Sequence, residues 1–306
     1  MGRILVIRGG AVGDFILTLP AINLLKESLP DNELEILGYT PIISLAEAAG
    51  LAHKTRSIEH GALAAFFIPN GVLDPNWMEY FGSFNLIVSY IYDPDGFFHA
   101  NLEKCGKATI IACSHRVEEP GDHAAIQLAR PLEKLALFLD KPSPDLDIGS
   151  NGTGKSGQKR IVIHPGSGGK HKVWPTKNWI SVAQKIASSR PLDKLVIVTG
   201  EAEEEHGTKA AMLEGLRGIP HDHLDSLALP QLAAELSECD LFLGHDSGIS
   251  HLAAACGLPC VLLFGPTNPE VWAPKNQGVQ VIQSPEGNLT KLATEDVILA
   301  AHQALI

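Results

Sequence analysis

The sequence predicts an α/β fold of two domains, each organised around a parallel β-sheet. Short apolar runs such as Arg3–Arg8 alternate with helical segments through both halves of the chain. This alternation is typical of βαβ units, whose consecutive strands run parallel. The 306 residues suffice for two domains of about 150 residues each. A stretch rich in Gly, Ser and Pro at 141–159 separates the two halves.

The predicted domains are residues 1–145 and 159–306, with a linker at 146–158 between them. Ligands of open parallel sheets bind at the carboxyl ends of the strands. Two such domains therefore predict a cleft bounded by both sets of strand ends. For the last helix, near 291–305, packing back on the first domain is one expected arrangement.

The bulk composition is that of an ordinary globular protein, with 45% hydrophobic and 19% charged residues. No apolar run reaches the roughly 18 residues that a membrane-spanning helix needs. The N-terminus is typical of a strand and lacks a cleavable signal pattern. The five cysteines include no CxxC pair, which favours reduced thiols. We therefore expect a cytoplasmic location.

The net charge of −11 is concentrated in the first half of the chain. Residues 1–150 carry 11 Lys and Arg against 19 Asp and Glu, whereas residues 151–306 carry 13 against 16. An acidic surface repels nucleic-acid phosphates and anionic lipid headgroups. The sequence therefore argues against a nucleic-acid partner and against strong attraction to anionic membranes.

Hydrophobic periodicity and Gly and Pro signals predict the elements of the first domain. The expected strands are 3–8, 33–37, 54–58, 84–90 and 108–112. The expected helices are 15–29, 41–49, two short segments within 61–82, and 123–139. Pro20 lies inside the first of these helices, where proline predicts a kink or a restart.

The second domain repeats the alternation of strands and helices. Its expected strands are 160–164, 194–199, 241–243, 260–264 and 279–282. Its expected helices are 177–189, 203–213, 229–238, 249–256 and 291–305. The polar stretch His221–Asp225 is interpreted as an exposed connection before a helix.

The first candidate motif is the turn Gly9–Asp14 between a strand and a helix. Gly9, Gly10 and Gly13 allow a tight turn, and Asp14 lies at the helix start, where the helix dipole favours a carboxylate. The GxGxxG spacing of dinucleotide sites is absent. Two interpretations stay open: Asp14 caps the helix, or it projects into the cleft as a general base.

The second and third candidate motifs follow strands of the second domain. In the stretch 163–174, Ser167, Gly168 and Lys172 offer a hydroxyl, backbone N–H groups and a positive charge suited to phosphate. In the stretch 244–269, Asp246 or Ser247 can cap a helix whose N-terminus is suited to phosphate. His251 is expected one turn into that helix, facing the same mouth.

Metal and hydrolase sites have little support in the sequence. Asp93-Pro94-Asp95 is interpreted as a solvated turn, and the thirteen histidines include no HExxH arrangement. Ser247 has Asp246 and His251 nearby but lacks the G-x-S-x-G setting of a nucleophile elbow. We therefore predict neither a bound metal nor another cofactor.

Three stretches resemble glycosyltransferase family 9, which is typified by ADP-heptose:lipopolysaccharide heptosyltransferases. The first resembles the family's GD…LPA motif, the second its K-x-W-P…W motif and the third its D-[ST]-G-x-x-H…[FY]-G-[PS]-T motif. They are, in turn, Val12–Asp14 with Thr18–Ala21; His164–Ser167 with Lys172–Pro175 and Trp179; and Asp246–His251 with Phe264–Thr267. Their order matches that of the family and they span nearly the whole chain.

The resemblance implies a GT-B fold, in which two Rossmann-like domains face each other across a cleft. It implies that the first domain binds the acceptor and the second the nucleotide-sugar donor, and that transfer inverts the anomeric centre without a metal. The catalytic residues it implies are Asp14, as base, and Lys172, which neutralises the donor diphosphate. Donor-binding positions are Ser167, Gly168, Lys172, Asp246, Ser247, Gly248, His251 and, more loosely, Glu203; acceptor-side loop positions are Arg8, Gly10 and Gly13.

These observations lead to one main hypothesis and two alternatives. The main hypothesis is inverting transfer of a sugar, with heptose as a candidate, from an ADP-linked donor to a cell-envelope glycan or glycolipid. Such an acceptor makes weak peripheral association with the inner face of the cytoplasmic membrane a further candidate property. The alternatives are a nucleotide-sugar epimerase of GT-B type and a non-catalytic nucleotide-sugar-binding protein. The oligomeric state is not predicted.

Overall fold

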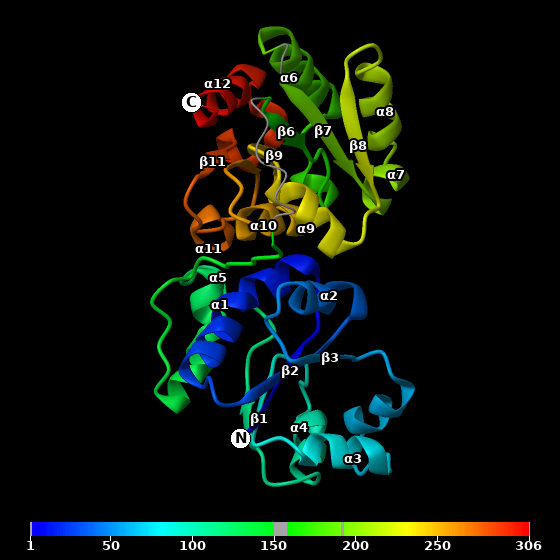
Figure 1. Ribbon diagram of the computed structural model, residues 1–306, viewed down its shortest axis with the longest axis vertical. Helices are drawn as coiled ribbons and strands as arrows, with labels where there is room; N and C mark the ends of the chain where they lie inside the picture. The colour runs from blue at the N-terminus through cyan, green and yellow to red at the C-terminus, as the bar shows by residue number, and fades with distance from the viewer. Residues whose placement is uncertain (1, 150–157, 191–192, 306) are drawn as a thin grey trace. The chain divides into compact units, whose positions relative to one another are not determined.

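The computed structural model describes residues 2–149, 158–190 and 193–305, which form two compact units, Met1–Pro142 and Ser143–Ile306 (Figure 1). The boundary between the two units, at Pro142 and Ser143, precedes the predicted linker at 146–158. Leu146 is buried, and its N–H donates to the carbonyl oxygen of Ala255 at 2.9 Å. The start of the predicted linker thus packs on the second unit, and its stretch 150–157 lies outside the described residues.

The first unit contains a five-stranded parallel sheet in the order β3-β2-β1-β4-β5. Its central strands are almost wholly buried, as the continuous apolar runs predict. The strands are β1 (Arg3–Arg8), β2 (Glu33–Gly38), β3 (Lys54–Ser57), β4 (Leu86–Ser89) and β5 (Thr109–Ala112).

Helical segments connect these strands. They are α1 (Val12–Ser28), α2 (Thr40–Ala48), the 3₁₀ turn η1 (Gly61–Phe67), α3 (Pro75–Gly82), α4 (Phe97–Glu103), α5 (Ala124–Ala129) and the 3₁₀ turn η2 (Arg130–Leu135). The predicted restart at Pro20 is wrong, because α1 runs continuously past that residue. The predicted helix 123–139 is shorter and changes to 3₁₀ geometry at Arg130, directly before Pro131.

The second unit contains a six-stranded parallel sheet in the order β11-β10-β9-β6-β7-β8. The strands are β6 (Arg160–Ile163), β7 (Lys194–Thr199), β8 (His221–Asp225), β9 (Leu241–His245), β10 (Cys260–Phe264) and β11 (Val279–Gln283). The interpretation of His221–Asp225 as an exposed connection is therefore wrong. It forms a half-buried edge strand.

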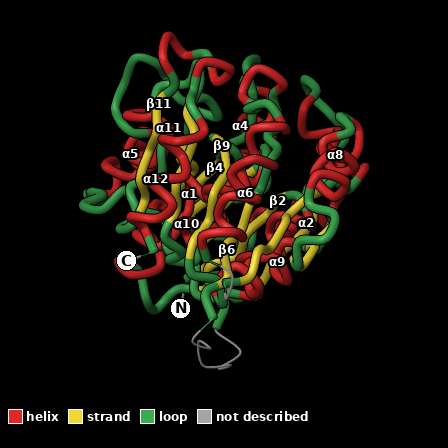
Figure 2. Tube along the Cα trace, turned by 90° about the horizontal axis from the view of Figure 1, so that it is seen from above, coloured by secondary structure: helices red, strands yellow, loops and turns green. Residues whose placement is uncertain are grey.

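The helical segments of the second unit again alternate with strands along the trace, red against yellow in Figure 2. They are η3 (Lys170–Lys172), α6 (Thr176–Ser189), α7 (Glu201–Glu205), α8 (Thr208–Gly215), α9 (Leu229–Ser237), α10 (Gly248–Ala255), α11 (Pro269–Trp272), η4 (Pro285–Gly287), η5 (Leu289–Lys291) and α12 (Thr294–Ala304). The predicted helix 203–213 is split at Gly207, which has a φ of +70°. The buried face of α12 packs on α6, β9 and β10, within its own unit.

Each unit has its own hydrophobic core. In the first unit, aromatic side chains of η1, α3 and α4 pack against β1 and β4. In the second unit, Trp174 and Trp179 are fully buried and meet edge to face, with ring centroids 5.1 Å apart. These cores fix the carboxyl ends of the strands, where the candidate site residues lie.

Candidate functional site

The turn after β1 holds Asp14 at the start of α1. Gly10 has a φ of +98°, a left-handed conformation that favours glycine. Asp14 is the third residue of α1, and its Oδ2 accepts a hydrogen bond from the N–H of Ala11 at 2.9 Å. The carboxylate thus caps the helix, which is one of the two interpretations that the sequence left open. Gly13 lies inside the first turn of α1, so the prediction that it shapes the preceding turn is wrong.

Arg8, the last residue of β1, is buried beside this turn, with its side chain 3% exposed. Its Nε donates to Thr18 Oγ1 at 3.0 Å, and its Nη2 donates to the carbonyl oxygen of Asp14 at 3.3 Å. The same Nη2 lies 3.5 Å from Asp14 Oδ1. Burial lowers the pKa of Arg8, whereas the Asp14 carboxylate raises it. Arg8 therefore acts as a buried cation that positions Asp14.

A cavity of about 560 Å³ opens at this turn. Gly9, Gly10 and Asp14 form part of its wall, and the Asp14 side chain is 39% exposed. The aromatic residues in its lining are Tyr39, Phe67, Tyr90 and Tyr92. A carboxylate that is both fixed and accessible can accept a proton from a bound hydroxyl group.

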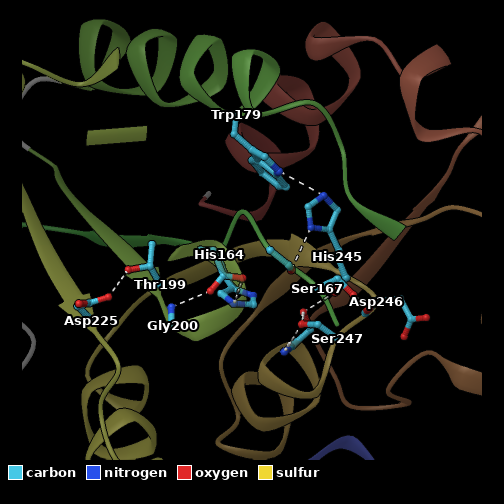
Figure 3. A network of polar contacts seen from close by, with 12 residues as sticks. His164, Ser167, Trp179, Thr199, Gly200, Asp225, His245, Asp246 and Ser247 are labelled. Carbon is cyan, nitrogen blue, oxygen red and sulfur yellow. Dashed lines mark hydrogen bonds and ion pairs between the residues drawn. The ribbon is translucent and has the colours of Figure 1, made fainter. Parts of the chain in front are cut away.

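In the second unit, Asp246 organises the residues that follow β9. Its Oδ2 accepts hydrogen bonds from Lys172 Nζ at 2.6 Å and from Thr267 Oγ1 at 2.8 Å. Its backbone carbonyl accepts one from Ser167 Oγ at 2.8 Å (Figure 3). The Asp246 side chain is 8% exposed, whereas that of Lys172 is 27% exposed. Since an ammonium group has three N–H donors, Lys172 can bind both Asp246 and an anionic ligand.

His245, the last residue of β9, connects three segments of the second unit (Figure 3). Its Nε2 accepts hydrogen bonds from the backbone N–H of Trp174 at 2.8 Å and from Trp179 Nε1 at 3.2 Å. Its Nδ1 therefore carries the proton and donates to the carbonyl oxygen of Gly166 at 3.2 Å. Burial lowers the pKa of His245 to about 3, so the ring is neutral. No role for His245 was predicted from the sequence.

The N-terminus of α10 lies directly after Asp246. Ser247 Oγ accepts a hydrogen bond from the N–H of Ser250 at 3.2 Å, so Ser247 is the predicted helix cap. The first turn of a helix presents N–H groups that have no intrahelical partner, and it begins here at Gly248. His251 is buried, with its Nε2 4.0 Å from Asp246 Oδ1. The N-terminus of α10 and the Lys172 ammonium group, which contacts Asp246, therefore lie at the same turn after β9.

Glu203 lies beneath the loop that follows β6. Its side chain is 5% exposed; its Oε2 accepts a hydrogen bond from the N–H of Gly200 at 2.7 Å, and its Oε1 lies 3.7 Å from His164 Nε2. Burial lowers the pKa of His164 to about 4. A Cβ on Gly166 would lie 1.4 Å from Glu203 Oε1, whereas Gly168 is exposed with open space around its Cβ position. The Glu203 carboxylate thus fills the space below the loop.

A polar cluster that the sequence analysis missed joins the ends of β7 and β8. Asp225 accepts a hydrogen bond from Thr199 Oγ1 at 2.7 Å (Figure 3). It accepts another from Lys209 Nζ, also at 2.7 Å. The bonds from Lys209 and Thr199 hold the pKa of Asp225 below its usual value. His223 Nε2 lies 2.8 Å from the same Thr199 hydroxyl. The sequence signal for this cluster was the polar pattern of residues 221–225, which we interpreted as an exposed connection.

Asp93, one half of the Asp93-Pro94-Asp95 pair, is not a solvated turn residue. Its side chain is 5% exposed, and its oxygens accept hydrogen bonds from the N–H groups of Phe98 at 3.1 Å and His99 at 3.0 Å. Although burial raises the pKa of Asp93, the bonds from His99 and Phe98 bring it below its usual value. Asp93 therefore holds the start of α4.

The structure groups the predicted residues within each unit. In the first unit it brings Arg8 and Gly10 next to Asp14. In the second unit it brings Lys172 and Ser167 to Asp246, at the N-terminus of α10.

Comparison with known proteins relates this arrangement to one enzyme family. Residues 111–302 match the model of glycosyltransferase family 9 (heptosyltransferase). Lipooligosaccharide heptosyltransferase 2 of Haemophilus influenzae is 28% identical over 141 residues, covering 45% of this chain and 40% of that protein. Lipopolysaccharide heptosyltransferase 1 of Pseudomonas aeruginosa is 30% identical over 156 residues, covering 49% and 41%. The chain therefore spans about two fifths of the length of these curated relatives.

Among solved structures, the Escherichia coli heptosyltransferase WaaC with ADP has a similar fold. It matches with a TM-score of 0.77 and 15% identity, over 99% of both chains. The predicted α/β fold of GT-B type, with two parallel sheets, is confirmed by this match and by the strand order.

Proposed function

Because this chain belongs to glycosyltransferase family 9 (heptosyltransferase), we propose that it is an inverting glycosyltransferase. Its donor is a nucleotide-diphosphate sugar, with ADP as the favoured nucleotide and heptose as the candidate sugar. Its acceptor is a glycan or glycolipid of the cell envelope. The observation that carries the proposal is the ammonium group of Lys172, held by Asp246 next to the N-terminus of α10.

The second unit stabilises the leaving group in this proposal. As the bond from the anomeric carbon to the diphosphate breaks, negative charge develops on the departing phosphate oxygens. The Lys172 ammonium and the N–H groups at the start of α10 supply positive charge and hydrogen bonds for them. Asp246 binds Lys172 and, through its carbonyl, Ser167, so its role is to position these two groups.

Asp14 is the base in this proposal. The acceptor hydroxyl oxygen attacks the anomeric carbon from the face opposite the diphosphate, and the Asp14 carboxylate takes its proton. Two features support this role: Asp14 is fixed by the N–H of Ala11 and by Arg8, and its side chain is accessible at the cavity.

We propose that the reaction needs no metal, since Lys172 and α10 provide the charge that a cation would otherwise supply. Among the described residues, no group of three or more His, Cys, Asp or Glu side chains is placed to hold a metal ion.

No helix within the described residues has the length and apolarity to cross a bilayer. We also propose weak peripheral contact with the inner face of the cytoplasmic membrane, where a glycolipid acceptor would be reached.

The substitution Asp14→Asn tests the proposal. It should lower transfer by at least about 100-fold, because the base is lost, while donor binding stays near that of the unchanged protein. Donor binding is measured by thermal shift with ADP-, GDP-, UDP- and CMP-sugars. Transfer is measured as nucleotide release with envelope glycolipid, with and without EDTA.

Asp31→Asn, at an exposed position, is the matched control and should leave transfer unchanged. Full transfer by Asp14→Asn would contradict the assigned base, and loss of transfer in EDTA would contradict metal independence. Turnover of the nucleotide sugar without acceptor would favour an epimerase. Tight donor binding with no turnover across an acceptor panel would favour a binding protein.

A further inference from the structure

The cavity at Asp14 is lined by three accessible aromatic side chains. Tyr39, Phe67 and Tyr92 line it and are 41%, 40% and 58% exposed. Phe67 is held by stacking on Phe98, with ring centroids 4.8 Å apart. Tyr92 is held beside His115, with centroids 4.5 Å apart. Large aromatic side chains held in place at one cavity indicate a surface for a ligand with apolar faces.

The charged groups of the same lining are Arg8, Asp14 and Glu59. Arg8 is enclosed and already bound to Asp14, whereas Glu59 is exposed and belongs to none of the ion pairs of the described residues. Burial, followed by Arg116 and Arg8, lowers the pKa of His115, so its ring is largely neutral near pH 7. Two carboxylates thus line the cavity, and its one permanent cation is already engaged.

We propose that the acceptor group that enters this cavity is an uncharged sugar ring, bound by aromatic faces and by hydrogen bonds to Asp14. This inference rests on the proposed function, because it specifies the acceptor of the same reaction. The C–H faces of a pyranose are apolar and pack on aromatic rings, while its hydroxyl groups remain free to donate to carboxylates.

A carboxylated or phosphorylated sugar is disfavoured at this cavity for two reasons. Its charge would lose hydration without gaining a free cation, and it would meet the Asp14 and Glu59 carboxylates. A further cation, Arg116, is exposed, and its Cζ atom lies 6.0 Å from the centroid of the Tyr92 ring. Arg116 is not among the residues that line the cavity, whereas both carboxylates are.

The test is a binding titration of the full chain without donor, followed by ligand-observed NMR. The probes are methyl α-mannopyranoside, methyl β-glucuronide and mannose 6-phosphate. The neutral glycoside should bind at least about tenfold more tightly than either charged probe, a difference of about 1.4 kcal/mol. A charged probe that binds as tightly as the neutral one, or the absence of binding by all three, would overturn the proposal.

Two substitutions separate the aromatic and the charge contributions. Tyr92→Ala should lower the affinity for the neutral glycoside by about tenfold. Tyr92→Phe should keep most of that affinity, because the aromatic ring is retained. Glu59→Gln should raise the affinity for the charged probes several-fold. The matched control Glu79→Gln, at an exposed position on α3, should leave that affinity unchanged. An unchanged affinity in Tyr92→Ala would also overturn the proposal.

The outcomes distinguish a failure of this inference from a failure of the proposed function. A protein that binds the neutral glycoside but no nucleotide sugar would disprove the transferase and leave the cavity assignment intact. A protein that binds nucleotide sugars and transfers to charged acceptors would disprove the cavity assignment alone.

Discussion

Lys172 lies in the 3₁₀ turn η3, and its contact with Asp246 fixes the position of its ammonium group. A lysine side chain has a flexible four-carbon stem, so a carboxylate partner restricts where its charge lies. Thr267 donates to the same Asp246 oxygen and restrains the carboxylate in turn. The charge that the proposed leaving group requires is therefore held by residues that need not touch the donor.

Substitution of Lys172 should lower catalytic use of the donor more than it lowers the stability of the fold. We expect Lys172→Met to lower kcat/KM by about 100-fold, as for loss of one charge-assisted hydrogen bond of about 2–3 kcal/mol. Asp246→Asn should give a smaller loss, about tenfold, because the ammonium group remains but is less well held. Steady-state kinetics with the identified donor measure both effects.

Lys185→Met is the matched control, since this lysine is exposed on α6. It should leave kcat/KM unchanged. Equal kinetics for Lys172→Met and Lys185→Met would rule out a role for Lys172 in donor use.

Sequence alone predicted Asp14, Lys172, Asp246 and Ser247 as candidates, because each lies in or directly beside a polar stretch between an apolar strand and a helix. It did not identify His245, whose role depends on contacts with distant parts of the chain. Those contacts follow from the strand order of the sheet, which no local pattern specifies. Residue roles created by tertiary neighbours are therefore the part that the sequence could not provide.

At the scale of elements, the loop after β6 rests on the first turn of α7. Gly166 is required there because a Cβ would collide with the buried Glu203 carboxylate. We expect Gly166→Ala to reduce the free energy of unfolding by about 1–3 kcal/mol, as for other overpacked sites. Urea unfolding followed by tryptophan fluorescence measures the change.

The double variant Gly166→Ala/Glu203→Ala should recover part of this loss, since the colliding carboxylate is then absent. Gly168→Ala is the matched control, because its Cβ meets nothing within 4 Å, and it should be nearly neutral. A loss in Gly168→Ala equal to that in Gly166→Ala would disprove the steric explanation.

Most strands and helices were predictable because buried parallel strands are continuous apolar runs. The errors have physical causes. In α1, Pro20 is buried among apolar neighbours, so packing keeps the helix continuous despite the missing N–H. Strand β8 lies at a sheet edge and is polar, so it lacks the hydrophobic signal of a strand.

At the scale of the whole molecule, two buried neutral histidines make stability depend on pH. Burial lowers the pKa of His164 to about 4 and that of His245 to about 3, against 6.5 as the ordinary value. Below pH 6.5 the unfolded chain therefore binds protons that the folded unit excludes. The stability that the two neutral rings contribute is fully present above pH 6.5. It is lost as the pH falls toward about 4 for His164 and about 3 for His245, by up to about 1.4 kcal/mol per pH unit for each histidine.

Urea unfolding of the second unit between pH 7 and pH 5 checks this expectation, with Trp174 and Trp179 as fluorescent reporters. His164→Gln should reduce the slope of stability against pH, whereas His206→Gln, at an exposed position, should not. A stability that does not change over this range would show that the two rings are not held neutral.

The hydrogen bonds described around His245, Asp246 and Lys172 join residues 166–267 and therefore all belong to the second unit. The family match likewise covers nearly all of that unit but only the end of the first. Mutations among the first 142 residues can accumulate without breaking these bonds. Under the proposed division of roles, such a chain can exchange one acceptor for another by drift in its first half, while the residues proposed to bind its donor are inherited unchanged.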